Sequence, residues 1–195
     1  MTAEPTTGGR ALRRDALANR ERVLAAAVTT MLRHGLQVPM ATIAAEAGVG
    51  VGTLYRRYAT REALLEALTE RSFRLVLAVA QEAAEKGGSG LEGIGWFLDR
   101  TIDHRAQLVL PLHGGPGQLS PRAAAVRADV HSALALLLAR GSADHTVRDD
   151  VTTGDVVIFG ALLSQPLSTG WERLARRQKT LFLRGLAPDV AHPSG

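Results

Sequence analysis

A short run of glycine, hydroxyl and arginine side chains between residues 50 and 56 offers the clearest chemistry in this sequence. Thr53 and Tyr55 carry hydroxyls that can bind phosphates, and Arg56 can donate paired hydrogen bonds to a guanine edge or clamp a phosphate. No acidic residue occurs from Ala47 to Arg61. A stretch of one charge sign is typical of a surface that binds a polyanion, whereas a solvated helix usually mixes signs. These residues therefore predict contacts with nucleic acid.

The segment that must position them, MATIAAEAGVGVGTLYRRY from Met40 to Tyr58, has the pattern of two short helices joined by a glycine turn. Gly48 follows the first helix, where a chain commonly enters the left-handed conformation. Placing Leu54 inward in the second helix, over about Val51–Arg57, leaves the hydroxyl and arginine side chains facing outward. The pattern predicts a helix-turn-helix whose second helix enters the major groove of double-stranded DNA. The alternative is a helical corner with a purely structural role.

Two longer runs carry a resemblance to a known family: RERVLAAAVTTMLRHG (Arg20–Gly35) and IAAEAGVGVGTLYRRYATREALLEAL (Ile43–Leu68). The motifs IAxxAGV, GTLYRxY and [ST]xEALLxA follow one another at fixed spacing. Over about its first third, the chain resembles the tetracycline-repressor (TetR-like) family of bacterial transcriptional regulators. The resemblance implies an all-α homodimer. Each subunit would have an N-terminal three-helix helix-turn-helix head and a larger helical body that binds a small effector and dimerises.

The resemblance and the outward face of the second helix together predict a set of DNA-binding residues. The set is Thr42, Gly50, Val51, Gly52, Thr53, Tyr55, Arg56 and Arg61. Four positions depart from the usual family pattern. Gly50 replaces a serine cap and Pro39 a hydroxyl cap, although both residues are tolerated at a helix start. Ala41 stands where a basic residue is frequent, and Val51, where lysine or proline is frequent, could touch a thymine methyl instead.

Composition limits the other classes of function. The 195 residues are 46% hydrophobic and 22% charged, as in ordinary globular proteins, and the formal charge of +4 favours nucleic acid only weakly. The absence of cysteine excludes a disulfide framework, a thiolate nucleophile and a thiolate zinc site. No apolar run reaches the ~20 residues of a membrane helix, and the first residues lack a secretory signal. We expect a cytoplasmic protein without a cofactor or a metal.

The chain divides into four predicted segments. Residues 1–12 have the composition of a disordered basic leader, and 13–70 form the helix-turn-helix DNA-binding domain. Residues 71–187 form the effector-binding and dimerisation domain, and 188–195 form a loose tail. The leader's arginines could lie along phosphates or simply be solvated.

The body pattern predicts further helices over residues 91–110, 120–140 and 152–169, and a last one striped from Trp171 to Phe182. Within the third, small residues permit close helix packing, and Pro166 should kink or end it. In the family the last two long helices build a four-helix dimer interface, and these two match that position. The alternative is that both stripes belong to the intramolecular core.

By resemblance, an effector pocket lies among the central body helices. The candidates are polar or aromatic groups on otherwise apolar helices: Trp96, Arg100, His104, Leu108, His113, Arg127, His131 and Phe159. His104 and His131 could converge, but no carboxylate or thiolate stands at metal-binding spacing. The loop PLHGGPG (Pro111–Gly117) could border the pocket. Its HGG is similar to a hydrolase oxyanion loop, but the chain lacks the GxSxG of that fold, so we predict no catalytic residues and no enzyme.

These patterns predict a sequence-specific repressor that a small molecule of unknown identity releases from an inverted-repeat operator. The alternative is a ligand-binding helical dimer whose DNA binding is weak or depends on a co-ligand.

Overall fold

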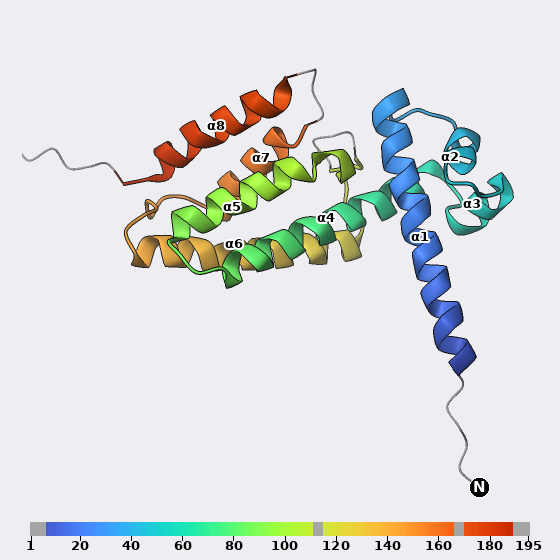
Figure 1. Cartoon of the computed structure of the whole chain (residues 1–195), viewed down its shortest axis with the longest axis horizontal. Coiled ribbons are helices and arrows are strands. Elements are labelled where there is room, and N and C mark those ends of the chain that lie inside the picture. The colour runs from blue at the N-terminus through green and yellow to red at the C-terminus, as the bar shows by residue number, and fades with distance from the viewer. Residues whose placement is uncertain (1–6, 111–114, 166–169, 189–195) are drawn as a thin grey trace, which may run out of the picture. The chain divides into compact units, whose positions relative to one another are not determined.

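The computed structural model describes residues 7–110, 115–165 and 170–188, although not the side chains of residues 7–13, 15 and 16. Over these ranges every regular element is a helix, which confirms the predicted all-α fold (Figure 1). The helices are α1 (Thr7–His34), α2 (Met40–Glu46), α3 (Val51–Arg57), α4 (Arg61–Glu85), α5 (Gly90–Asp103), the 3-10 turn η1 (Arg105–Gln107), α6 (Pro121–Ala143), α7 (Thr153–Leu163) and α8 (Trp171–Leu186).

The chain forms two compact units, Met1–Ala67 and Leu68–Gly195, which we call the head and the body. Helix α4 begins in the head and continues without a break into the body. None of the helices in the described part of the chain is long and apolar enough to cross a membrane.

In the head, α1 packs against α2, and α2 packs against α3. Apolar side chains three and four residues apart on α1 form a core stripe, because this spacing places them on one face of a helix. The fully buried side chains of the head include Leu24, Ala27, Met31, Ile43, Leu54 and Leu64. The core fixes the angle between α2 and α3, and so the face that α3 presents.

Helix α1 starts earlier than the sequence predicts. The composition of residues 1–12 indicated a disordered leader, but α1 already includes residues from Thr7 onward. Arginine, alanine and leucine after Gly9 favour a helix, and extending an existing helix avoids a new nucleation cost. Residues 1–6 of the predicted leader, and 189–195 of the predicted tail, lie outside the described residues.

In the body, α5 is the central helix and contacts α6, α7 and α8 (Figure 1). Its start lies so close to the end of α6 that a Cβ built on Gly90 would overlap the backbone of Gly141. Two polar side chains beyond α6 cap α5. Asp144 accepts from the Gly90 N–H at 2.8 Å, and the Thr146 hydroxyl accepts from the Leu91 N–H at 3.2 Å. The close approach and the caps fix α5 against α6.

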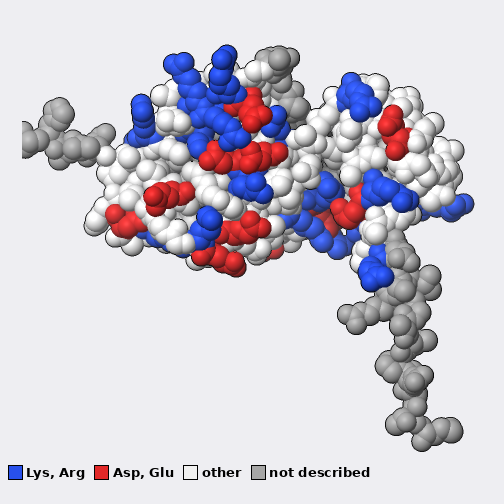
Figure 2. All heavy atoms as spheres, viewed as in Figure 1, with Lys and Arg blue, Asp and Glu red and all other residues white. Residues whose placement is uncertain are grey.

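A network of ion pairs joins α5 to α8. Asp99 pairs with Lys179 at 2.7 Å and with Arg176 at 3.2 Å, and Arg176 also pairs with Asp103 at 2.8 Å. Glu172, one turn earlier on α8, joins this network by pairing with Arg176 at 3.1 Å. Figure 2 shows basic side chains crowded around acidic ones over α8. The acidic partners hold the pKa of Arg176 above its usual value, with the Asp103 hydrogen bond as the largest cause.

Two predicted helices end earlier than expected. The helix predicted over residues 91–110 stops at Asp103, and the chain passes through η1 into an extended segment. This change of direction buries three consecutive apolar residues, from Leu108 to Leu110. Similarly, α7 ends at Leu163 rather than near residue 169. The predicted effect of Pro166 lies outside the described residues.

Candidate nucleic-acid interface and ligand pocket

The turn between α2 and α3 sets the exposure of α3. Gly48 has φ of +64°, in the left-handed region that glycine enters without strain. Beyond it, Leu54 points inward and is 1% exposed, and Tyr58 just after the helix is also buried. Val51 and Tyr55 are 45% and 48% exposed, although they are large and partly apolar. One face of α3 thus anchors the helix in the head and the other faces solvent.

The exposed face of α3 carries a preorganised donor. Nη2 of Arg56 donates to Oγ1 of Thr53 at 2.9 Å, one turn earlier on the same face. This bond holds the guanidinium along the helix and leaves its other N–H groups available, because a guanidinium has five donors. Gly52 lies on the same surface, and a Cβ there would meet no atom within 4 Å. The packing of the head therefore does not itself require glycine at that position.

Arg61, a predicted DNA contact, has internal partners. Its guanidinium donates to the carbonyl oxygens of Leu36 at 2.6 Å, Gln37 at 3.5 Å and Val38 at 2.5 Å. These carbonyls belong to the loop between α1 and α2, so Arg61 ties the start of α4 to that loop. Thr42 on α2 is half-buried. The first role that the structure gives Arg61 is positioning within the head.

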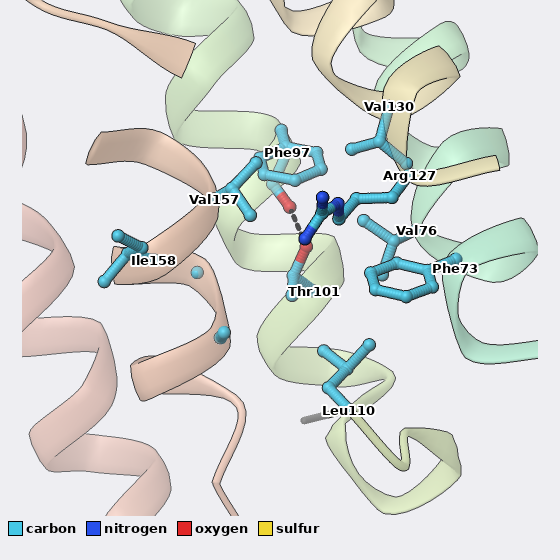
Figure 3. A pocket seen from close by; sticks show the side chains of 11 residues that line it. Phe73, Val76, Phe97, Thr101, Leu110, Arg127, Val130, Val157 and Ile158 are labelled. Atoms are coloured by element: carbon cyan, nitrogen blue, oxygen red, sulfur yellow. Dashed lines mark hydrogen bonds between the residues drawn. The ribbon is translucent and has the colours of Figure 1, made fainter. Parts of the chain in front are cut away.

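A pocket with a volume of about 190 Å³ lies in the body among α4, α5, α6 and α7 (Figure 3). Nearly all of its lining is apolar: Phe73, Val76, Phe97, Thr101, Leu110, Arg127, Val130, Val157, Ile158, Gly160 and Ala161. A cavity of roughly 150 Å³ is enough to hold benzene, so this volume suits roughly one small ring or a short aliphatic chain. The pocket therefore selects small apolar groups.

Two polar side chains line this pocket, and their hydrogen bonding differs. Oγ1 of Thr101 donates to the carbonyl oxygen of Phe97 at 2.8 Å, so its proton is already used. Arg127 extends from α6 toward Phe97 and Thr101, with its guanidinium at the centre of the pocket view (Figure 3). Within the described residues Arg127 has no hydrogen-bond or ion-pair partner.

Comparisons with known proteins give matches in both the head and the body. Residues 23–68 match the family described as bacterial regulatory proteins, tetR family, and residues 97–188 match the family described as transcriptional regulator SbtR-like, C-terminal domain. A TetR transcription regulatory protein from Mycobacterium vanbaalenii is 31% identical, with 91% of this chain and 99% of that chain covered and a TM-score of 0.65. This chain belongs to the TetR family.

Other solved structures agree. A TetR transcriptional regulator from Streptomyces coelicolor is 30% identical, with 87% of this chain and 99% of that chain covered and a TM-score of 0.61. The TetR-family regulator PfmR from Thermus thermophilus is 19% identical, covers 87% of this chain and 97% of its own, and has a TM-score of 0.64, which supports the fold alone. No curated protein matches this chain. TetR-family members are DNA-binding transcriptional regulators and not enzymes.

In the structure of this TetR-family protein, most of the predicted effector residues lie outside the lining of the pocket. Arg127 lines the pocket. Trp96 instead lies under two cations, with Lys86 at 5.2 Å and Arg100 at 5.9 Å from its ring centroid. Phe159 stacks on Phe182 with ring centroids 3.9 Å apart. These aromatic rings pack with other elements of the body and do not line the pocket.

The remaining candidates also have other partners. His104 lies near Arg100 at 3.5 Å and Gln107 at 3.2 Å, and burial, followed by the charge of Arg100, lowers its pKa. His131 shares a hydrogen bond with Thr153 at 2.8 Å. Leu108 is fully buried in the core. His113 lies outside the described residues, and the described ones contain no cluster of three metal-binding side chains.

The residues that sequence reasoning missed are the apolar walls of the pocket. Phe73 and Val76 lie on α4 and look in the sequence like ordinary apolar residues of a helix. Gly160 is one of the small residues that, in the sequence, predict close helix packing, and a Cβ there would meet a Leu98 methyl at 3.4 Å and the Phe97 ring at 3.7 Å. A signal was present in the small residues Gly160 and Ala161, because small side chains between large ones leave space as well as allow contact.

Proposed function

We propose that this protein is a transcriptional repressor that binds an inverted-repeat operator as a homodimer and is released when a small effector fills the body pocket. The observation that carries the proposal is the exposed face of α3, with Val51, Thr53, Tyr55 and Arg56 accessible and no acidic residue among them. A positive face of this kind contacts phosphates for affinity and base edges for specificity. Acting on chromosomal DNA, the protein would work in the cytoplasm.

The dimer in this proposal is supported by apolar side chains on the last two helices. Ile158 and Leu162 are 57% and 46% exposed on α7, and Leu174 and Leu181 are 44% and 49% exposed on α8. Large aliphatic side chains on neighbouring helices favour burial against a second surface. A second copy of the chain supplies the same helices by two-fold symmetry. Two heads related by that symmetry would read an operator that is itself an inverted repeat.

The effector step in the proposal is a population shift. An effector would favour a body conformation in which the two heads no longer match the spacing of the half-sites. It can shift the equilibrium only by its difference in affinity for the two states.

The test is selection of genomic DNA fragments by the purified full-length protein at physiological salt. Arg56→Ala is compared with Arg184→Ala, which removes the same charge from an exposed position on α8. We expect the wild type and Arg184→Ala to enrich one inverted repeat and Arg56→Ala to lose that enrichment. Equal enrichment by Arg56→Ala would remove Arg56 from the interface.

The alternative, a ligand-binding dimer whose DNA binding is weak or depends on a co-ligand, predicts another result. In that case the wild type enriches no sequence although a folded dimer is present in the same sample. A steep fall of DNA affinity with rising salt, together with a defined footprint, would reject this alternative.

A further inference from the structure

The pocket in the body combines apolar walls with one cation that has no partner in the described structure. We propose that its ligand is a small amphipathic carboxylate, whose carboxylate pairs with Arg127 and whose apolar part fills the space beyond. This inference rests on the proposed function, since it names the chemical class of the effector. The observations that support this ligand class all come from the body, so ligand binding can be tested without knowledge of the operator.

The charge of the pocket selects an anion. Among the eleven lining residues, Arg127 is the one ionisable side chain, and none is acidic. A guanidinium remains protonated at all physiological pH values, so the pocket lining carries an uncompensated positive charge. Figure 3 shows this guanidinium directed toward Phe97 and Thr101, away from the α6 backbone that bears it. An oxyanion placed there would gain a charge-assisted hydrogen bond that no protein group in the lining supplies.

The supply of hydrogen-bond donors narrows the anion to a carboxylate. Thr101 can only accept from a ligand, because its hydroxyl proton is donated to the carbonyl of Phe97. Arg127 is therefore the one donor side chain left in the lining. A planar guanidinium matches the two oxygens of one carboxylate. A phosphate monoester has further oxygens and more charge, and these lining side chains offer it no second donor.

The position of Arg127 also orients the ligand. Arg127 is an exposed residue, whereas Phe73, Val76 and Val130 are buried. The charged end beside Arg127 would thus keep some contact with water, and the apolar end would lie among the buried walls. The volume of about 190 Å³ limits that end to the size of one small ring or a short aliphatic chain.

The experiment measures binding of defined probes to the full-length protein by titration calorimetry. The probes are phenylacetate and hexanoate, each compared with its neutral amide, phenylacetamide or hexanamide. The variants are Arg127→Gln, which removes the charge, Arg127→Lys, which keeps it, and Arg184→Gln, which removes an exposed arginine from α8. Thermal unfolding without a probe checks that each variant folds, which we expect because Arg127 has no partner in the described structure.

We expect at least one acid to bind the wild type and its amide to bind about tenfold more weakly, the usual effect of removing a charged hydrogen bond. Arg127→Gln should lose the preference for the acid, and Arg184→Gln should behave as the wild type. Arg127→Lys should keep part of the preference, because the charge remains but the planar pair of donors is lost. Equal binding of acid and amide, an unchanged preference in Arg127→Gln, or binding of neither acid would overturn the assignment.

The same samples are then mixed with the selected operator fragment, which separates the two proposals. An acid that binds through Arg127 but leaves DNA binding unchanged supports the ligand class and contradicts its role as effector. Operator binding by a wild type that binds no acid supports the repressor and contradicts the ligand class.

Discussion

Arg56 and Arg61 are five residues apart and chemically identical, yet their surroundings give them different roles. Arg56 lies on the exposed face of α3 and bonds only one turn back, to Thr53. Arg61 donates to three backbone carbonyls of the α1–α2 loop. Removing Arg61 would leave these carbonyls without a charged donor, whereas removing Arg56 disturbs little of the fold. The two substitutions therefore separate positioning within the head from contact with DNA.

We predict that Arg61→Ala lowers the free energy of unfolding by about 1–3 kcal/mol, the usual effect of losing hydrogen bonds to a charged group. Arg56→Ala should change it by less than about 0.5 kcal/mol, as most surface substitutions do. Urea unfolding of the two variants and the wild type measures both values. The sequence alone indicated a phosphate contact for Arg61. Unchanged stability together with weakened DNA binding would favour that role.

For individual residues, the sequence predicted those roles that depend on neighbours close in the chain. The outward face of α3 follows from helical periodicity over seven residues, and the structure exposes the side chains that this pattern placed outside. The partners of Arg61 lie 23 to 25 residues earlier in the chain, beyond any local pattern. The apolar lining of the pocket could not be predicted from the sequence. Most of its residues come from four different helices, and on each helix they have the pattern of ordinary core residues.

Helices α4 and α6 meet at a buried acidic group. Glu70 on α4 is 8% exposed, and its Oε1 pairs with Arg74 at 2.6 Å and with Arg122 of α6 at 2.9 Å. Neither contact has hydrogen-bond alignment, so the attraction is mainly between charges. Arg122 precedes Arg127 by five residues on α6. A ligand that moves the start of α6 would therefore move a charge against α4, the helix that continues into the head.

We predict that Glu70→Gln leaves the affinity of the free protein for its ligand nearly unchanged but weakens ligand-induced release of DNA. Gln keeps the size of the side chain and removes the charge that attracts Arg122. Coupling is reciprocal, so ligand affinity should differ less between DNA-bound and free protein in the variant than in the wild type. Titrations with and without operator measure this difference. A full ligand response in a folded Glu70→Gln protein would contradict the coupling.

The cap of α5 predicts a dependence on pH. The Thr146 hydroxyl, and then the Gly90 N–H, hold the pKa of Asp144 below its usual value of 3.8. Because the folded pKa is lowered, the carboxylate stabilises the fold above pH 3.8, and this contribution is lost as the pH falls toward the lower value. We predict that the wild type loses more stability than Asp144→Asn between about pH 6 and about pH 3. Urea midpoints of both proteins test this, and parallel losses would rule out a role for this carboxylate.

Element boundaries were the least predictable part of the fold. Ser120 and Thr152, typical helix caps, start α6 and α7 where the pattern placed them. The end of α5 at Asp103 has no comparable local signal, because the turn is stabilised by burial of Leu108 and Leu110 in the body core. The close approach of Gly90 to Gly141 likewise joins residues that are distant in the sequence. Tertiary packing decided these features.

For the whole molecule, the exposed leucines of α7 and α8 would be the reason that it works as a pair. Leu162 on α7 and Leu181 on α8 belong to the two helices of the proposed dimer interface. Leu136 is also exposed, at 61%, but it lies on α6, outside that interface. The three leucines are similar in exposure and differ in the helix that bears them. They form a matched set for testing the dimer.

We predict that Leu162→Glu and Leu181→Glu each shift the protein toward a folded monomer, because a buried carboxylate without a partner is costly. Leu136→Glu should remain dimeric. Sedimentation of the three variants and the wild type measures the mass, and operator affinity should fall only in the monomeric variants. A wild-type monomer, or dissociation caused only by Leu136→Glu, would place the interface elsewhere.

The ion pairs between α5 and α8 also make the protein suitable for chemical labelling. The chain has two lysines, Lys86 and Lys179. Lys86 is exposed, but the ammonium of Lys179 lies 2.7 Å from both oxygens of Asp99 and its side chain is 16% exposed. An amine reagent should therefore modify Lys86 quickly and Lys179 slowly, with Lys86 as the internal standard. Any ligand or DNA that loosens α8 from α5 would be detected as faster acylation of a single nitrogen.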